Sequence, residues 1–386
     1  MPSSSSVSHS REPSDTRNLL RNKAGTNSSR RGERKNLKTF HVLRKAAKNV
    51  AKAVTFERMM FFPDILVTHH CTQRCLQCSI PLAASPAKPF MDFNDYKKIV
   101  DLLDDHGTQG FVISGGEPML HPKLPEFIQY AASKNFGRIH LLSTLYGPER
   151  LIERAVHAAI DAGISLSVSF DGLDEVGDTV RGARNVSERI KKSIGYVKSE
   201  MERRGKRIHC AVGVVLSQLN VHQTAEILRY LEEVGWLTEV DVYRWQSQSQ
   251  LENDAMKFKD TKELRAAIEL VKKSPVVLTP NWLLDMLPDY LEGKFEKYCP
   301  YMSLPTFGTK VFIHPDGSVK SCMGDAFGNI LHQTPEELFK SDEWKMQMEE
   351  KLRCEGCVNT CYTRGKVLYP TSMKEVRANW EQIWNR

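Results

Sequence analysis

Nine cysteines occur in the 386-residue chain, and three of them lie within one short segment. Cys71, Cys75 and Cys78 have the spacing Cys-x3-Cys-x2-Cys, so their thiolates can converge on one metal centre. A structural zinc site takes four ligands, and iron–sulfur clusters normally take four thiolates. Three thiolates would leave one iron with the open coordination position that catalysis requires. The spacing therefore favours a cluster over zinc, unless a distant fourth cysteine closes the site.

A second group of cysteines lies within the last 90 residues of the chain. Its members are Cys299, Cys322, Cys354, Cys357 and Cys361. A second metal centre is the simplest interpretation, and four of these thiolates would suit a closed zinc site as well as a cluster. The chain shows no signal-peptide pattern, so we expect a cytoplasmic location, where a disulfide framework would not persist.

Two glycines and a carboxylate follow the apolar run 111–114. Consecutive glycines at the end of a strand let the backbone approach a ligand closely. Glu117, directly after Gly115 and Gly116, can receive an ammonium group. Taken alone, the motif also fits a tight turn with a solvated glutamate.

These motifs are placed at the ends of predicted strands. Strands are predicted at 65–68, 111–114, 139–143, 164–170, 208–216 and 239–245. Amphipathic helices are predicted between them at 92–105, 124–134, 148–162, 187–204 and 222–234. This alternation indicates parallel strands covered by helices. We therefore expect an α/β fold, a partial (β/α)6 TIM-like barrel, with its chemistry at the carboxyl ends of the strands.

Composition divides the rest of the chain. Residues 1–36 are predicted to form a disordered basic tail, because they cannot bury enough apolar surface to offset the entropy of ordering. The remaining predicted parts are a basic amphipathic helix at 37–58, the barrel core at 59–246, a helical connector at 247–298, a small β-hairpin and helix domain at 299–370 and a tail at 371–386. The turn sequence His314-Pro315-Asp316-Gly317 predicts the hairpin.

The net charge of +7 belongs to the amino-terminal region. The first 50 residues hold 12 Lys and Arg and 3 Asp and Glu, whereas the other 336 hold 42 and 44. A neutral body argues against a nucleic-acid partner. Within 37–54 the apolar face carries Leu43 and Ala47, and we expect it to pack on the barrel. Peripheral contact of this helix with an anionic membrane is the alternative.

The segment Cys71 to Cys78, Cys-Thr-Gln-Arg-Cys-Leu-Gln-Cys, resembles the cluster loop of the radical S-adenosylmethionine enzymes. It follows the first predicted strand, as in that family. Gly115-Gly116-Glu117 is similar to the family's Gly-Gly-Glu motif. Ser169-Phe170-Asp171-Gly172 with Arg181-Gly182 resembles a pattern of the branch that modifies peptides and small molecules. The resemblance covers roughly residues 60–365.

The resemblance implies that the three cysteines hold a 4Fe–4S cluster whose fourth iron binds S-adenosylmethionine. The motif ending in Glu117 would hold the methionine amino group, and Arg181 the carboxylate, which arginine binds bidentately. The residues predicted to bind S-adenosylmethionine are Gly115, Gly116, Glu117, Ser143, Thr144, Ser169, Arg181 and Leu216. Family analogy places substrate contacts near the end of the sixth strand, at Tyr243 and Trp245.

The second cysteine group resembles the SPASM or shorter twitch extension of the same enzymes. The full SPASM pattern has seven cysteines, and the five present here fit one auxiliary 4Fe–4S cluster with one thiol left over. We expect Cys299, Cys322, Cys354 and Cys357 to be the ligands. Cys361 is then a competing ligand or a thiol on the substrate side.

Together these features predict an enzyme that reductively cleaves S-adenosylmethionine to a 5′-deoxyadenosyl radical. The radical would abstract a hydrogen atom from an unactivated C–H bond, giving an oxidised, rearranged or cross-linked product in a biosynthetic or maturation pathway. The substrate is open between a small molecule, a tetrapyrrole, a lipid-like molecule and a peptide. A flavodoxin- or ferredoxin-like protein is the expected reductant. The alternative is a non-catalytic iron–sulfur or zinc protein, such as a scaffold or an electron carrier.

Overall fold

A computed structural model provides the structure of the chain. It describes residues 43–45, 47–48, 51, 60, 62–80, 88–245, 251–294, 311–321, 325–352 and 358. The predicted tails at 1–36 and 371–386 lie outside these residues. So do all five cysteines of the second group, Cys299, Cys322, Cys354, Cys357 and Cys361. Their assignment as cluster ligands stays a prediction.

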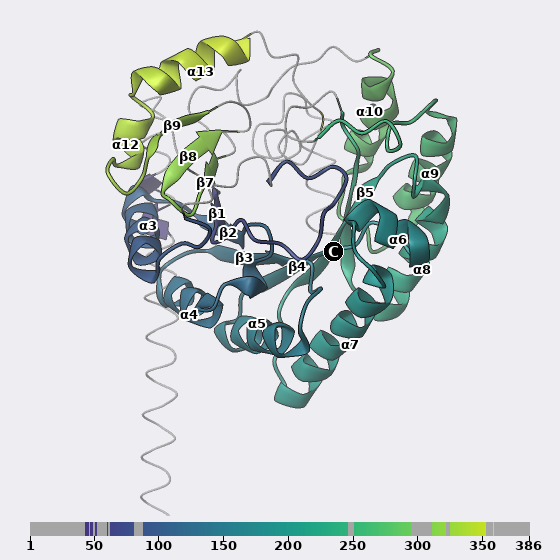
Figure 1. Ribbon diagram of the computed structural model, residues 1–386, viewed down its shortest axis with the longest axis horizontal. Coiled ribbons are helices and arrows are strands. Elements are labelled where there is room, and N and C mark those ends of the chain that lie inside the picture. The colour runs from purple at the N-terminus through teal and green to yellow at the C-terminus, as the bar shows by residue number, and fades with distance from the viewer. Residues whose placement is uncertain are drawn as a thin grey trace, which may run out of the picture.

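A curved nine-stranded sheet forms the centre of the described structure, in the order β6-β5-β4-β3-β2-β1-β7-β8-β9 (Figure 1). The first six strands are β1 (Asp64–Leu66), β2 (Gly110–Ser114), β3 (Arg138–Ser143), β4 (Ser165–Ser169), β5 (Cys210–Leu216) and β6 (Leu237–Val242). Each pairs in parallel with its neighbour. The predicted partial barrel is therefore confirmed, and the carboxyl ends of these strands meet at one edge.

Helices cover the outer face of this sheet (Figure 1). The helices between the strands are α3 (Phe93–His106), α4 (Leu124–Ser133), α5 (Glu149–Ala162), α6 (Asp174–Arg181), α7 (Val186–Arg204) and α8 (Thr224–Val234), with short 3₁₀ turns η1 (Pro118–Leu120) and η2 (Val221–Gln223). In α3, Tyr96, Ile99, Val100 and Leu103 are buried, as their i, i+3, i+4, i+7 spacing predicts. Gly107 ends the helix in the left-handed conformation, with φ 98°.

The connector after β6 is helical, with α9 (Lys262–Lys273) and α10 (Asn281–Leu291). The segment between these two helices protects the edge of the sheet. Thr238 of β6 donates its backbone N–H to Val276 at 2.8 Å and accepts one from Leu278 at 2.7 Å. This edge of the barrel therefore has its hydrogen bonds satisfied within the chain.

The predicted hairpin is confirmed, and it continues the sheet of the core. Its strands β7 (Val311–Ile313) and β8 (Ser318–Ser321) pair antiparallel, and β7 also pairs in parallel with β1. The strand β9 (Ala326–Asn329) and the helices α12 (Pro335–Leu338) and α13 (Asp342–Leu352) follow. The turn sequence predicts two antiparallel strands, but it carries no information about which edge they join.

The amino-terminal helix packs differently from the prediction where the structure describes it. Leu43, expected on the buried face, is 63% exposed, and Ala47 is exposed as well. Lys45 is instead buried in an ion pair with Asp104, and its ammonium lies 4.1 Å from the ring centre of Phe136. A buried acceptor on α3 therefore decided the orientation, which apolar spacing cannot predict. None of the described helices is long and apolar enough to cross a bilayer.

Candidate functional site

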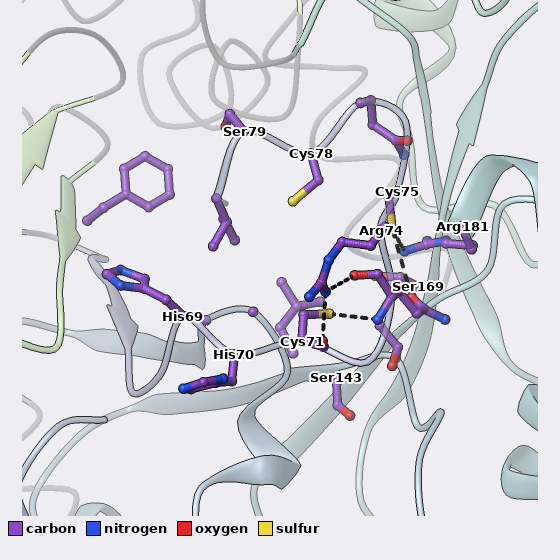
Figure 2. Close-up of a pocket in the computed structure, with 18 of the residues that line it drawn as sticks. His69, His70, Cys71, Arg74, Cys75, Cys78, Ser79, Ser143, Ser169 and Arg181 are labelled. Atoms are coloured by element: carbon purple, nitrogen blue, oxygen red, sulfur yellow. Dashed lines mark hydrogen bonds between the residues drawn. The ribbon is translucent and has the colours of Figure 1, made fainter. Parts of the chain in front are cut away.

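A cavity of about 870 Å³ opens at the carboxyl ends of β1 to β4 (Figure 2). It brings together all three cysteines of the first group and six of the eight residues predicted to bind S-adenosylmethionine. The lining residues used below are Cys71, Gln73, Cys75, Cys78, Gly115, Gly116, Ser143, Thr144, Ser169 and Arg181. Its size lies within the range of about 300–1,000 Å³ that is usual for small-molecule sites.

Backbone hydrogen bonds to helix α6 hold the cysteine loop in place. The N–H groups of Arg74 and Leu76 donate to the carbonyl oxygens of Arg181 and Val180, each at 3.0 Å. These two carbonyls end α6, where helix carbonyls lack partners inside the helix. The carboxyl end of α6 therefore fixes the loop that carries the thiols.

Without a metal, burial keeps the thiols of Cys71 and Cys78 protonated. Burial, together with the nearby Glu117 and the other two cysteines, raises the pKa of Cys71 to about 11. Burial also raises the pKa of Cys78. A bound metal ion favours the thiolate, so loading of the site would release protons.

The donor set at the cavity suits a cluster. Cys71, Cys75 and Cys78 supply three thiols, and in a 4Fe–4S cluster each thiolate binds a different iron. A structural zinc ion takes four protein ligands.

Two glycines allow β2 to end directly against the cysteine loop. The N–H of Gly116 donates to the carbonyl of Thr68 at 2.8 Å, and that of Glu117 to His70 at 2.7 Å. A Cβ on Gly115 would lie 2.3 Å from the Thr68 oxygen, and one on Gly116 would lie 2.3 Å from the His70 oxygen. Gly115 also has φ 147°, which side chains rarely adopt. No larger residue fits at either position.

The Glu117 carboxylate binds the end of β3 and does not line the cavity. The side chain is fully buried. One oxygen accepts hydrogen bonds from Ser143 Oγ at 2.7 Å and Met119 N–H at 3.1 Å. The other accepts from the backbone N–H and Oγ1 of Thr144 at 2.7 and 2.6 Å. Glu117 therefore positions the cavity residues Ser143 and Thr144. Its contact with the amino group of S-adenosylmethionine stays a prediction.

Burial raises the pKa of Glu117, although the hydrogen bonds from Thr144, Ser143 and Met119 oppose this shift. Four donors on two oxygens satisfy a carboxylate well. The four hydrogen bonds therefore offset the cost of burying the Glu117 carboxyl group.

Arg181 enters the cavity from the end of α6 and is paired with Asp171. Its Nη2 lies 2.7 Å from Asp171 Oδ2, and both side chains are buried. Burial alone would lower the pKa of Arg181, but Asp171 and Cys75 outweigh it, and the pKa is raised. Arg181 therefore carries its charge inside the site.

The remaining polar groups fit the cofactors that the sequence implies. Among the described residues, four buried atoms of cavity-lining side chains have no hydrogen-bond partner: His69 Nδ1, Gln73 Nε2, Gln77 Oε1 and Arg181 Nε. Buried polar atoms are normally paired. The cavity thus offers three thiols, glycine backbone, hydroxyls and unpaired polar atoms. This set of groups suits a cluster together with a polar, partly anionic ligand.

Besides Glu117, three predicted site residues do not line the cavity. Leu216 is a buried residue at the end of β5. Tyr243 is fully buried, and its hydroxyl donates to the Leu251 carbonyl and accepts the Asn253 N–H, each at 2.6 Å. Trp245 packs beside it, with ring centres 6.0 Å apart. Contact of Tyr243 and Trp245 with a substrate stays a prediction.

Gln73 and Phe312 are among the cavity residues that sequence reasoning missed. Gln73 lies inside the cysteine loop, is 2% exposed and lines the cavity. Phe312 reaches the cavity from β7. Its position depends on the pairing of β7 with β1, which no local pattern reveals. The polar Gln73 between two cysteines was visible in the sequence, but spacing alone does not show its burial.

Comparison with known proteins adds a family match. The family model described as Radical SAM superfamily matches residues 65–231. The chain is 26% identical over 265 residues to the PqqA peptide cyclase of Bradyrhizobium diazoefficiens, a match that covers 66% of this chain and 64% of that relative. It is 26% identical over 322 residues to the subtilosin biosynthesis protein AlbA of Bacillus subtilis, covering 78% of this chain and 66% of that relative.

The fold is similar to that of a solved structure as well. Streptococcus suis SuiB bound to the precursor peptide SuiA matches with a TM-score of 0.57, over 86% of this chain and 78% of that chain. The sequence identity is 17%, so this likeness concerns the fold.

Proposed function

Because the chain belongs to the radical S-adenosylmethionine superfamily, we propose that it matures a peptide by abstracting a hydrogen atom from an unactivated carbon. The cluster and S-adenosylmethionine, when bound, supply the 5′-deoxyadenosyl radical for that step. The observation that carries the proposal is the convergence of Cys71, Cys75 and Cys78 with the ends of β2, β3 and β4 on one cavity.

The residues of the chain have distinct parts in this proposal. The three cysteines bind the cluster, and the backbone at Gly115 and Gly116 approaches the amino acid end of S-adenosylmethionine. The hydroxyls at Ser143 and Thr144, fixed by Glu117, face its ribose. The walls of the cavity exclude water and other C–H bonds, which confines a reactive species to its intended target.

The substrate class rests on the relatives. Two curated relatives named above are a peptide cyclase and a bacteriocin biosynthesis protein, and the solved relative was crystallised with a precursor peptide. These names favour a peptide over the tetrapyrrole and lipid-like substrates that the sequence left open. A flavodoxin- or ferredoxin-like protein as reductant, and contact of residues 37–54 with a membrane surface, are further proposals that these relatives do not address.

The proposal is tested with the full-length protein, reconstituted anaerobically with iron and sulfide. With S-adenosylmethionine and dithionite we expect 5′-deoxyadenosine, detected by liquid chromatography and mass spectrometry. Co-expression with a short peptide encoded beside the gene is expected to change the mass of that peptide, typically by loss of two hydrogen atoms. The matched control is the chain with Gly116→Ala, in which the added Cβ would clash with the His70 carbonyl.

A cluster-replete sample that forms no 5′-deoxyadenosine would support the alternative, a non-catalytic iron–sulfur carrier or scaffold. Formation of 5′-deoxyadenosine with no change in any neighbouring peptide would contradict the peptide assignment alone.

A further inference from the structure

The sulfur of Cys75 makes hydrogen bonds with two buried polar side chains, those of Arg181 and Gln73. Arg181 Nη1 donates to Cys75 Sγ at 3.7 Å. On another side, the Cys75 thiol donates to Gln73 Oε1 at 3.8 Å. Arg181 is 7% exposed and Gln73 is 2% exposed. Among the described residues, side-chain hydrogen bonds are made with the sulfur of Cys75 and with neither that of Cys71 nor that of Cys78.

Arg181 cannot easily move away from this sulfur, because it is fixed at both ends. Its backbone carbonyl accepts the N–H of Arg74 in the cysteine loop at 3.0 Å. Its guanidinium is held by Asp171, which is 1% exposed. Asp171 is fixed in turn, since its Oδ1 accepts the backbone N–H of Val215 at 2.8 Å and its Oδ2 accepts Gln77 Nε2 at 3.2 Å.

A ligand thiolate in this position would receive both a positive charge and hydrogen bonds. Once Cys75 has lost its proton on binding a metal, its sulfur can only accept hydrogen bonds. Gln73 can then donate from its amide Nε2, which has no partner among the described residues. Hydrogen bonds to cluster sulfurs and nearby charge help to set the reduction potential of an iron–sulfur cluster. Both stabilise the reduced cluster, because it carries one more negative charge.

We propose that Arg181 and Gln73 are tuning residues that raise the reduction potential of the cluster through the Cys75 thiolate, with Asp171 positioning the arginine. This inference rests on the cluster of the proposed function. It differs from the assignment that the sequence resemblance gives to Arg181, which is contact with the carboxylate of S-adenosylmethionine. The two assignments make different predictions for the protein without S-adenosylmethionine.

The test is a redox titration of the reconstituted full-length protein without S-adenosylmethionine, followed by electron paramagnetic resonance. The signal of this cluster is identified beforehand as the one that changes when S-adenosylmethionine is added. We expect Arg181→Met to lower the reduction equilibrium constant at least about tenfold, a shift of about 59 mV to more negative potential. Arg181→Lys keeps the charge and should lie closer to the wild type. Binding of S-adenosylmethionine is measured by calorimetry on the same samples.

Arg74→Met is the matched control, because it also removes one guanidinium near the three cysteines, in this case from the cysteine loop itself. Arg74 is exposed, and its Nη1 donates to the carbonyl oxygens of Cys71 and Gln73, so solvent screens its charge. Its shift should be clearly smaller than that of Arg181→Met. If Arg181→Met fails to retain iron, Gln73→Leu tests the same sulfur and should also shift the potential to more negative values.

An unchanged potential in Arg181→Met and Gln73→Leu, with weaker binding of S-adenosylmethionine in Arg181→Met, would overturn the inference and leave Arg181 as a carboxylate ligand. The absence of any such cluster signal in the wild type would overturn the proposed function instead.

Discussion

Replacement of Cys71, Cys75 and Cys78 together by alanine is expected to remove about four irons per chain. It should also abolish binding of S-adenosylmethionine and formation of 5′-deoxyadenosine. The reason is that all three thiols line one cavity and no other described cysteine does. Iron and sulfide analysis, absorbance spectra and calorimetry with S-adenosylmethionine measure the three effects.

Cys210→Ala is the control for this variant. Cys210 lies at the start of β5, where burial raises its pKa to about 12. It lies outside the cavity, so its loss should leave the iron content and 5′-deoxyadenosine formation at wild-type levels. Retention of full iron content and S-adenosylmethionine binding in the triple variant would show that the cofactors bind elsewhere.

Glu117→Ala should be the most damaging single change at the site that leaves the cysteines intact. It removes the acceptors of two buried hydroxyls and two backbone N–H groups and opens a void. We expect the free energy of unfolding to fall by about 3–5 kcal/mol. Ser143 and Thr144 also lose their positions, so binding of S-adenosylmethionine should weaken. Chemical denaturation and calorimetry provide the two measurements.

Glu117→Gln separates charge from shape. One amide oxygen can still accept from Thr144, but the NH2 group would face the N–H of Met119, so we expect a loss of about 1–3 kcal/mol. Because burial raises the folded pKa of Glu117 above the unfolded value of 4.5, the folded state favours the protonated carboxyl group. The stability that this preference contributes is fully present below pH 4.5 and is lost as pH rises through the folded pKa. The stability difference between wild type and Glu117→Gln should therefore grow as pH falls.

The exposed Glu233→Gln in α8 is the matched control, with an expected change within about 0.5 kcal/mol. Equal stability of Glu117→Ala and Glu233→Gln would contradict the positioning role of Glu117.

The sequence predicted the parallel core well because its signals are local. Alternating apolar runs and amphipathic helices predict β1 to β6 and the helices α3, α4, α5, α7 and α8 within a few residues. The motifs at Cys71 and Gly115 end their strands, so parallel pairing alone brings them to one edge of the sheet.

What the sequence did not predict depends on long-range contacts. The pairing of β7 with β1, which brings Phe312 to the cavity, joins segments more than 200 residues apart. Helix α6 is only eight residues long, and its importance comes from carbonyls that bind the cysteine loop. The Glu117 carboxylate points to the end of β3 because it accepts four hydrogen bonds in this position. Tyr243 points inward because Leu251 and Asn253 satisfy its hydroxyl group.

The central claim is that the loop of Cys71, Cys75 and Cys78 leaves one iron of its cluster for S-adenosylmethionine to bind. Mössbauer spectroscopy of the anaerobically reconstituted full-length protein, with and without S-adenosylmethionine, tests it most directly. We predict that one iron subsite changes its isomer shift when S-adenosylmethionine is added, and that this change is absent in the triple cysteine variant. Zinc in this loop by metal analysis, or iron subsites that S-adenosylmethionine leaves unchanged, would contradict the account.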